Sequence, residues 1–143
     1  MRIALMATGL VLAIGAAHAD VAPPREDRGE GTWYGQMRQV NVEGEESYPM
    51  VLRLTGSGGR SEYPKLNCGG ELERLGSASG GYVVYKETIT RGGTNDGKES
   101  ACVDGVVVIH VEKNELVLGW FGAIDGEPYL ASARLTRGQF NSK

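Results

Sequence analysis

The sequence has few of the residues that build metal centres. It contains two cysteines and two histidines in 143 residues. One histidine, His18, lies in an N-terminal segment that we expect to be removed, which leaves His110 alone in the remaining chain. Structural zinc sites use four ligands, mostly Cys and His. We therefore predict no metal site and no cofactor.

Motifs for enzyme chemistry are also lacking. The chain contains no Gly-x-Ser-x-Gly nucleophile elbow and no complete phosphate-binding loop. His110 lies between Ile109 and Val111 in a strand-like run, with no nucleophile beside it. The sequence predicts a protein that is not an enzyme.

The chain has no cluster of basic residues. Lys and Arg number 15 against 18 Asp and Glu, and removing the first 19 residues, which include Arg2, would leave 14 basic residues. Nucleic-acid binding depends on Lys and Arg contacts to phosphates. We expect no nucleic-acid partner, and this mildly acidic chain would suit a protein partner.

The N-terminus has the pattern of an export signal. Arg2 precedes an apolar run from Ile3 to Ala17, and the small-x-small pattern at Ala17 to Ala19 predicts cleavage before Asp20. The apolar run is shorter than the roughly 20 residues that span a bilayer. We predict a cleaved signal peptide over residues 1–19, no membrane span, and a periplasmic or secreted protein.

The rest of the chain predicts one domain. Residues 20–30 contain Pro23-Pro24 and a charged run, which indicates a flexible leader. Residues 31–137 read as strands and turns, and residues 138–143 show no pattern and are expected to be a disordered tail.

Alternating side chains predict an all-β fold. Tyr48, Met50, Leu52 and Leu54 share one face of a strand, with Val51 and Arg53 on the other face. The expected strands cover 32–42, 47–55, 60–66, 70–75, 82–91, 105–112, 116–122 and 129–137. Lys113-Asn114 and Asp125-Gly126 are hairpin signals. About eight strands favour a single antiparallel barrel, wide enough to be filled by side chains or to hold one small ligand.

Both cysteines lie in the predicted domain. In an exported chain, two cysteines most simply form one disulfide, so we predict a Cys68–Cys102 bond. Its closed loop of 34 residues would stabilise the fold by roughly 3–4 kcal/mol in the chain-entropy model.

The opening strand carries a short family signal. The run Gly31-Thr32-Trp33-Tyr34 resembles the Gly-x-Trp start of calycins, the lipocalin and avidin group. This resemblance implies a barrel in which Trp33 closes one end, and a carrier of a small apolar molecule. It does not imply a biotin pocket, since only Trp120 remains as a further tryptophan. Trp33 and Trp120 are candidate pocket residues.

A second resemblance lies in the run Ser77-Ala78-Ser79-Gly80-Gly81-Tyr82. It is similar to the inhibitory loop of exported C-type lysozyme inhibitors of the membrane-bound/periplasmic family, which are small eight-stranded barrels. The resemblance implies that Ser77, Ser79, Gly80 and Tyr82 contact a protein partner. The alternative is an ordinary solvated turn rich in Ser and Gly.

Glu87 is a third pocket candidate. It lies in the apolar row Val83, Tyr85 and Ile89, and an unpaired buried carboxylate is costly. If the row faces inward, Arg53, Arg134 or a tyrosine hydroxyl could pair with Glu87, either in a buried structural interaction or as a polar anchor at the floor of a ligand pocket. The alternative is a strand residue that faces outward. Residues 92–100 contain carboxylates, but not in the spacing of a calcium loop.

From these observations we expect an exported β-barrel that binds a protein, most concretely an inhibitor of a lysozyme or similar hydrolase acting through Ser77–Tyr82. The alternatives are a calycin-like carrier of a small apolar ligand and an envelope structural or stress protein.

Overall fold

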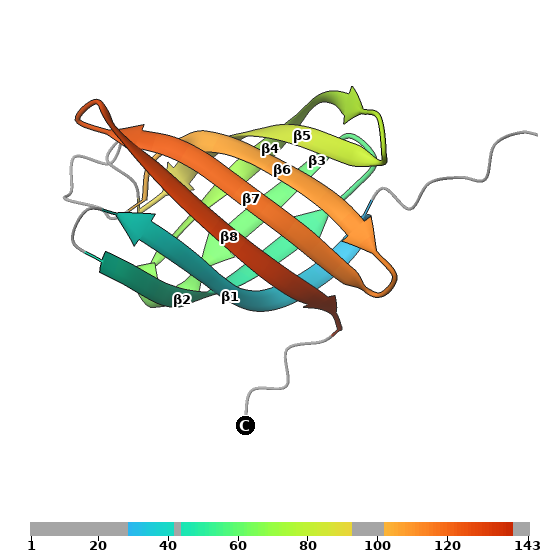
Figure 1. Cartoon of the computed structure of the whole chain (residues 1–143), viewed down its shortest axis with the longest axis horizontal. Helices are drawn as coiled ribbons and strands as arrows, with labels where there is room; N and C mark the ends of the chain where they lie inside the picture. The colour runs from blue at the N-terminus through green and yellow to red at the C-terminus, as the bar shows by residue number, and fades with distance from the viewer. Residues whose placement is uncertain (1–28, 42–43, 93–101, 139–143) are drawn as a thin grey trace, which may run out of the picture.

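The structure, a computed structural model, describes residues 29–41, 44–92 and 102–138. Eight strands form a closed antiparallel barrel in which each strand pairs with the next and β8 pairs with β1 (Figure 1). The strands are β1 (Gly31–Asn41), β2 (Gly44–Leu54), β3 (Gly58–Tyr63), β4 (Cys68–Ala78), β5 (Tyr82–Arg91), β6 (Gly105–Glu112), β7 (Glu115–Ile124) and β8 (Glu127–Arg137). The predicted all-β barrel of eight strands is confirmed.

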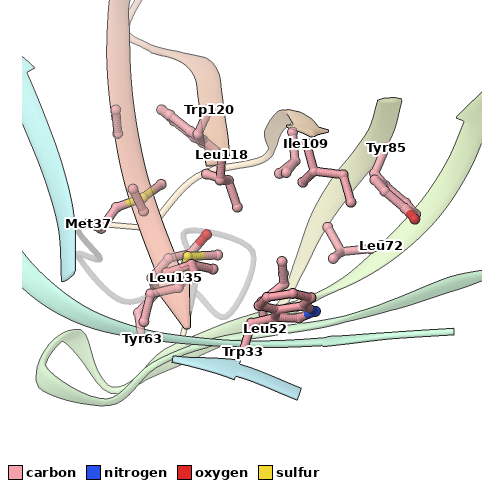
Figure 2. Close-up of a cluster of buried hydrophobic side chains, with 14 of the residues drawn as sticks. Trp33, Met37, Leu52, Tyr63, Leu72, Tyr85, Ile109, Leu118, Trp120 and Leu135 are labelled. Atoms are coloured by element: carbon pink, nitrogen blue, oxygen red, sulfur yellow. The ribbon is translucent and has the colours of Figure 1, made fainter. Parts of the chain in front are cut away.

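Buried side chains occupy the barrel interior, which the sequence left open as either filled or hollow. Met50, Leu52 and Leu54 of β2 are buried while Arg53 is exposed, and Ala133 and Leu135 of β8 alternate with exposed residues in the same way. Figure 2 shows large side chains from several strands meeting inside the barrel. A side-chain period of two places one apolar face inward around the whole sheet.

The third strand is shorter than predicted. It ends at Tyr63, and Pro64 begins the 3-10 turn η1 (Pro64–Leu66). Proline has no N–H to donate to a strand ladder, and Asn67 completes the turn with a left-handed φ of 52°. The predicted extension of this strand to Leu66 is therefore wrong. The Asp125-Gly126 hairpin is confirmed, with φ values of 51° and 83°.

The predicted disulfide is confirmed. Cys68 at the start of β4 bonds to Cys102, which precedes β6, with 6.5 Å between their Cα atoms. Both residues are buried. The bond ties the β3–β4 connection to the chain entering β6, and it is compatible with an oxidising compartment.

Several sequence predictions fall on residues that the structure does not describe. The signal peptide (1–19), most of the leader, most of the tail and the 93–101 segment lie outside the described ranges. Within those ranges, no helix has the length and apolar character needed to cross a membrane.

The two ends of the barrel differ. We call one the Trp33 end; it carries the β2–β3, β4–β5 and β6–β7 turns and the start of β1. There the Trp33 indole N–H donates to the Gly29 carbonyl at 2.7 Å, and the Arg137 guanidinium lies 4.5 Å from the ring centre. Gly29 is buried, and a methyl group on it would lie 3.1 Å from Ile109. Trp33 and the chain at Gly29 thus pack across this end.

We call the opposite end the mouth. It carries the connections β1–β2, β3–β4, β5–β6 and β7–β8, and also the disulfide. In Figure 2, Met37, Tyr63 and Trp120 lie toward one side of the core, whereas Trp33, Leu72 and Tyr85 lie toward the other.

Close packing of β1 against β8 predicts a specific effect of glycine substitution. A Cβ atom on Gly35 would lie 2.6 Å from the Arg134 carbonyl oxygen, whereas one on Gly119 would meet nothing within 4 Å. We expect Gly35→Ala to lower the free energy of unfolding by about 1–3 kcal/mol, because the neighbouring backbone must shift. Gly119→Ala, the matched control, should change it by less than about 0.5 kcal/mol. Urea unfolding measures both, and equal effects would contradict the β1–β8 closure.

Candidate ligand-binding site

Glu87 lies inside the barrel with no exposed surface. Its neighbours in the inward row of β5, Val83, Tyr85 and Ile89, are also buried. The row is set by strand alternation, so a charged residue in it must face the core.

Three neutral donors surround the Glu87 carboxylate. Oε1 accepts hydrogen bonds from the Ser61 hydroxyl and from the Tyr63 hydroxyl, the latter at 2.9 Å. Oε2 accepts from the Trp120 indole N–H at 2.7 Å. Ser61 and Tyr63 belong to β3 and Trp120 to β7, so these hydrogen bonds cross the barrel interior from both sides of β5.

The two arginines considered from the sequence lie elsewhere. Arg53 bonds to Glu62 at 2.6 Å, and Arg134 bonds to Glu115 at 3.1 Å, with all of these side chains largely in solvent. A tyrosine hydroxyl, the third alternative, is one of the observed partners of Glu87.

The environment of Glu87 shifts the pKa values of the surrounding groups. Burial raises the pKa of Glu87 above its ordinary value, and the hydrogen bonds from Ser61, Tyr63 and Trp120 partly oppose this shift. Burial, followed by the nearby Glu87 charge, raises the pKa of Tyr48 to about 12. The same two causes hold the pKa of Tyr63 well above its ordinary value.

A small cavity adjoins this carboxylate at the mouth. Its volume is about 20 Å³, enough for roughly one water molecule. The Tyr48 hydroxyl donates to Gln39 Oε1 at 2.8 Å, and the rings of Tyr48 and Tyr63 meet edge to face with centroids 6.0 Å apart. The lining is mostly apolar or aromatic and comprises Met37, Gln39, Tyr48, Tyr63, Leu66, Glu87, Ile89, Cys102, Val103, Trp120, Ile124 and Tyr129.

The structure brings two of the three predicted pocket residues together. Glu87 and Trp120 line the cavity and are bonded to each other. Trp33 does not line it and packs at the Trp33 end instead.

The Ser77–Tyr82 segment lies at the end away from the cavity. Ser77 belongs to the end of β4, Ser79 to Gly81 form the turn, and Tyr82 begins β5. Ser77, Ser79, Gly80 and Tyr82 are all exposed. This hairpin and the cavity are therefore two separate candidate surfaces.

An aromatic stack supports the hairpin. The rings of Tyr82 and His110 are nearly parallel, with centroids 4.7 Å apart, although Tyr82 remains 47% exposed. Arg74 Nη2 donates to the Ser77 hydroxyl oxygen. The φ values of Gly80 and Gly81, +79° and +78°, are ones that glycine adopts without strain.

A second hollow of about 110 Å³ lies over β3, β4 and β5, lined by Arg60, Ser61, Glu62, Gly69, Gly70, Glu71, Thr90 and Arg91. Its charges are partly paired within the protein, since Arg60 bonds to Glu71 at 3.3 Å and Glu62 to Arg53. Among the described residues, no group of three His, Cys, Asp or Glu side chains could hold a metal ion.

Ser61 and Tyr63 were not among the partners of Glu87 predicted by residue number from the sequence. Both were in the predicted strand 60–66, and a period of two places them on one face. Ser61 lies opposite Leu52 and Gly70, and Tyr63 lies opposite Cys68, all of them buried. The alternation of Ser61 and Tyr63 with the charged Arg60 and Glu62 was the signal available in the sequence.

Comparisons with known proteins gave no match: no protein-family model, no curated protein and no solved structure matches this chain. The resemblances to calycins and to lysozyme inhibitors therefore stay predictions, and the function is argued from the geometry of the site.

Burial of Glu87 predicts a pH dependence of stability. Because its pKa is raised above 4.5, the folded protein holds this proton more tightly than the unfolded chain does. The resulting stability is fully present below the unfolded-state pKa and is lost as the pH rises through the folded-state pKa.

We compare the wild type with Glu87→Gln, which does not titrate and can turn its carbonyl oxygen toward Trp120. The unfolding free energy of the wild type minus that of Glu87→Gln should decrease as the pH rises from about 4 to about 8. Urea unfolding at several pH values measures this difference. Parallel pH profiles for the two proteins would refute the assignment of a raised pKa to Glu87.

Proposed function

We propose that this protein is an exported small-ligand-binding barrel that takes one end of its ligand into the mouth cavity. The observation that supports this proposal best is the Glu87 carboxylate, buried beside a cavity and held by Ser61, Tyr63 and Trp120. A buried charge that only neutral groups solvate is expensive for stability alone. Its position beside a cavity is explained if it contacts a ligand.

The cavity has the composition of a small-molecule site. Such sites are mainly hydrophobic and aromatic, with a few polar groups that fix the ligand's orientation. Here Leu66, Val103 and Ile124 supply apolar surface, while Glu87 and Gln39 supply polar atoms. Since the cavity is only about 20 Å³, a ligand would insert a compact group and leave the rest of its length at the mouth.

The proposed location is the periplasm or the cell exterior. It is supported by the signal-peptide pattern of residues 1–19 and by the Cys68–Cys102 disulfide, which an oxidising compartment maintains.

Native mass spectrometry of the freshly purified protein tests this function. We expect a recurring bound mass, and its occupancy should fall about tenfold or more in Val103→Trp, because a large ring there would obstruct the cavity. Val108→Trp, on a half-buried position outside the cavity lining, is the matched control and should keep the bound mass. A wild type that carries no extra mass, and takes none from a small-molecule extract of cell envelopes, would reject the proposal.

A second candidate function is inhibition of a lysozyme or similar hydrolase by the Ser77–Tyr82 hairpin. It is supported by the exposed hydroxyls of Ser77 and Ser79 and by Tyr82, which is held against His110 yet remains 47% exposed. Serine hydroxyls can donate to carboxylates in a glycosidase cleft, and glycines allow close backbone approach.

A cell-wall turbidity assay with lysozyme tests the hairpin. If the hairpin inhibits, the purified protein slows clearing at stoichiometric excess, and Tyr82→Ala weakens this effect by about tenfold, as removal of a central aromatic contact does. Glu127→Ala, an exposed change at the mouth, should leave inhibition intact. Unimpeded clearing at excess wild-type protein would eliminate this candidate.

A further inference from the structure

Several hydrogen-bonding groups at the cavity can still accept a hydrogen bond. The Tyr63 hydroxyl and the Trp120 indole direct their protons to Glu87, and the Tyr48 hydroxyl directs its proton to Gln39. The Tyr48 oxygen and Gln39 Oε1 can still accept, and a carboxylate offers about four acceptor positions, of which three are occupied here. A ligand group that donates several hydrogen bonds would fit this arrangement.

The charge of the site is also unbalanced. The five salt bridges among the described residues join exposed side chains, and none includes Glu87. Asp104 also acts on Glu87, raising its pKa, and it carries a charge of the same sign. A cation would therefore gain more at this site than a neutral group, and an anion would be repelled.

The walls of the cavity favour a cation as well. Tyr48, Tyr63, Trp120 and Tyr129 all contribute to the lining. Aromatic rings attract ammonium and guanidinium groups through their negative faces, most strongly in sites removed from water.

The volume of the cavity distinguishes between small and large organic cations. A cavity of about 20 Å³ holds one group close to the size of water. A primary ammonium has that size and three donors, whereas a trimethylammonium group is larger and has none.

We propose that the ligand is a primary organic ammonium, an inference that rests on the proposed ligand-binding function. Its nitrogen lies beside Glu87 within reach of the Tyr48 and Gln39 oxygens, and its apolar chain leaves the cavity past Leu66, Val103 and Ile124.

Isothermal titration calorimetry with four probes of one chain length tests this inference: hexylammonium, hexyltrimethylammonium, 1-hexanol and hexanoate. At neutral pH, hexylammonium should bind the wild type at least about tenfold more tightly than each of the other three, the factor that one charge-assisted hydrogen bond supplies. Equal or tighter binding of any of the other three would overturn the inference.

Two variants assign the selectivity to the carboxylate. Glu87→Gln should weaken hexylammonium binding about tenfold or more and leave 1-hexanol within about twofold. Glu62→Gln removes the same charge from a side chain paired with Arg53 on the outside, and should leave hexylammonium binding within about twofold. If Glu87→Gln does not fold, Tyr48→Phe replaces it. This variant lacks one acceptor, and we expect it to bind hexylammonium about threefold more weakly. No loss in a folded variant would contradict the proposed contact.

The failures of the two proposals are distinguishable. A cellular ligand seen by mass spectrometry, together with a preference for 1-hexanol over hexylammonium, removes the ammonium inference and retains the binding function. Absence of both a cellular ligand and any probe binding removes the two together.

Discussion

The hydrogen bonding of the buried Glu87 carboxylate is the interaction on which the interior of this barrel depends. Glu87 belongs to β5, whereas its donors belong to β3 and β7, and neither of these strands is a neighbour of β5 in the sheet. The donors reach it because the sheet curves and brings inward side chains of these strands together. Curvature of the sheet and hydrogen bonding of the carboxylate are therefore linked.

The ends of the barrel have different roles in this arrangement. At the Trp33 end, one indole bonds to the Gly29 carbonyl and lies under Arg137, so polar groups are satisfied within the closing segment itself. At the mouth, the Cys68–Cys102 bond fixes the chain around a cavity whose polar atoms are only partly used. The Trp33 end is therefore closed by packed side chains, whereas the mouth is tied by the disulfide and contains the small cavity beside Glu87.

Much of the fold could be predicted from the sequence because strand alternation is a local property. Val83, Tyr85 and Ile89 put Glu87 in one row with apolar residues, although its inward direction stayed open, and the same alternation correctly separated Arg53 from the core. The disulfide followed from having two cysteines in a chain predicted to be exported. These inferences needed only residue spacing and composition.

The partners of Glu87 could not be predicted in the same way, because they depend on register between distant strands. β4 contains irregularities between Gly69 and Gly70 and between Arg74 and Gly76, which shift its pairing with β5. Such shifts decide which level of the barrel each inward residue occupies. They set the level of Ser61 and Tyr63, whose strand β3 is joined to β5 through β4, relative to Glu87, a relation that hydrophobic period alone does not contain.

The most direct test is a proton–nitrogen NMR correlation of the two tryptophan indole groups as the pH is varied. Trp120 donates to a carboxylate that titrates, whereas Trp33 donates to a backbone carbonyl. The account predicts that the Trp120 signal moves with a midpoint above 4.5, while the Trp33 signal stays fixed. Two signals that both stay fixed, or that move together, would contradict a buried Glu87 held by Trp120.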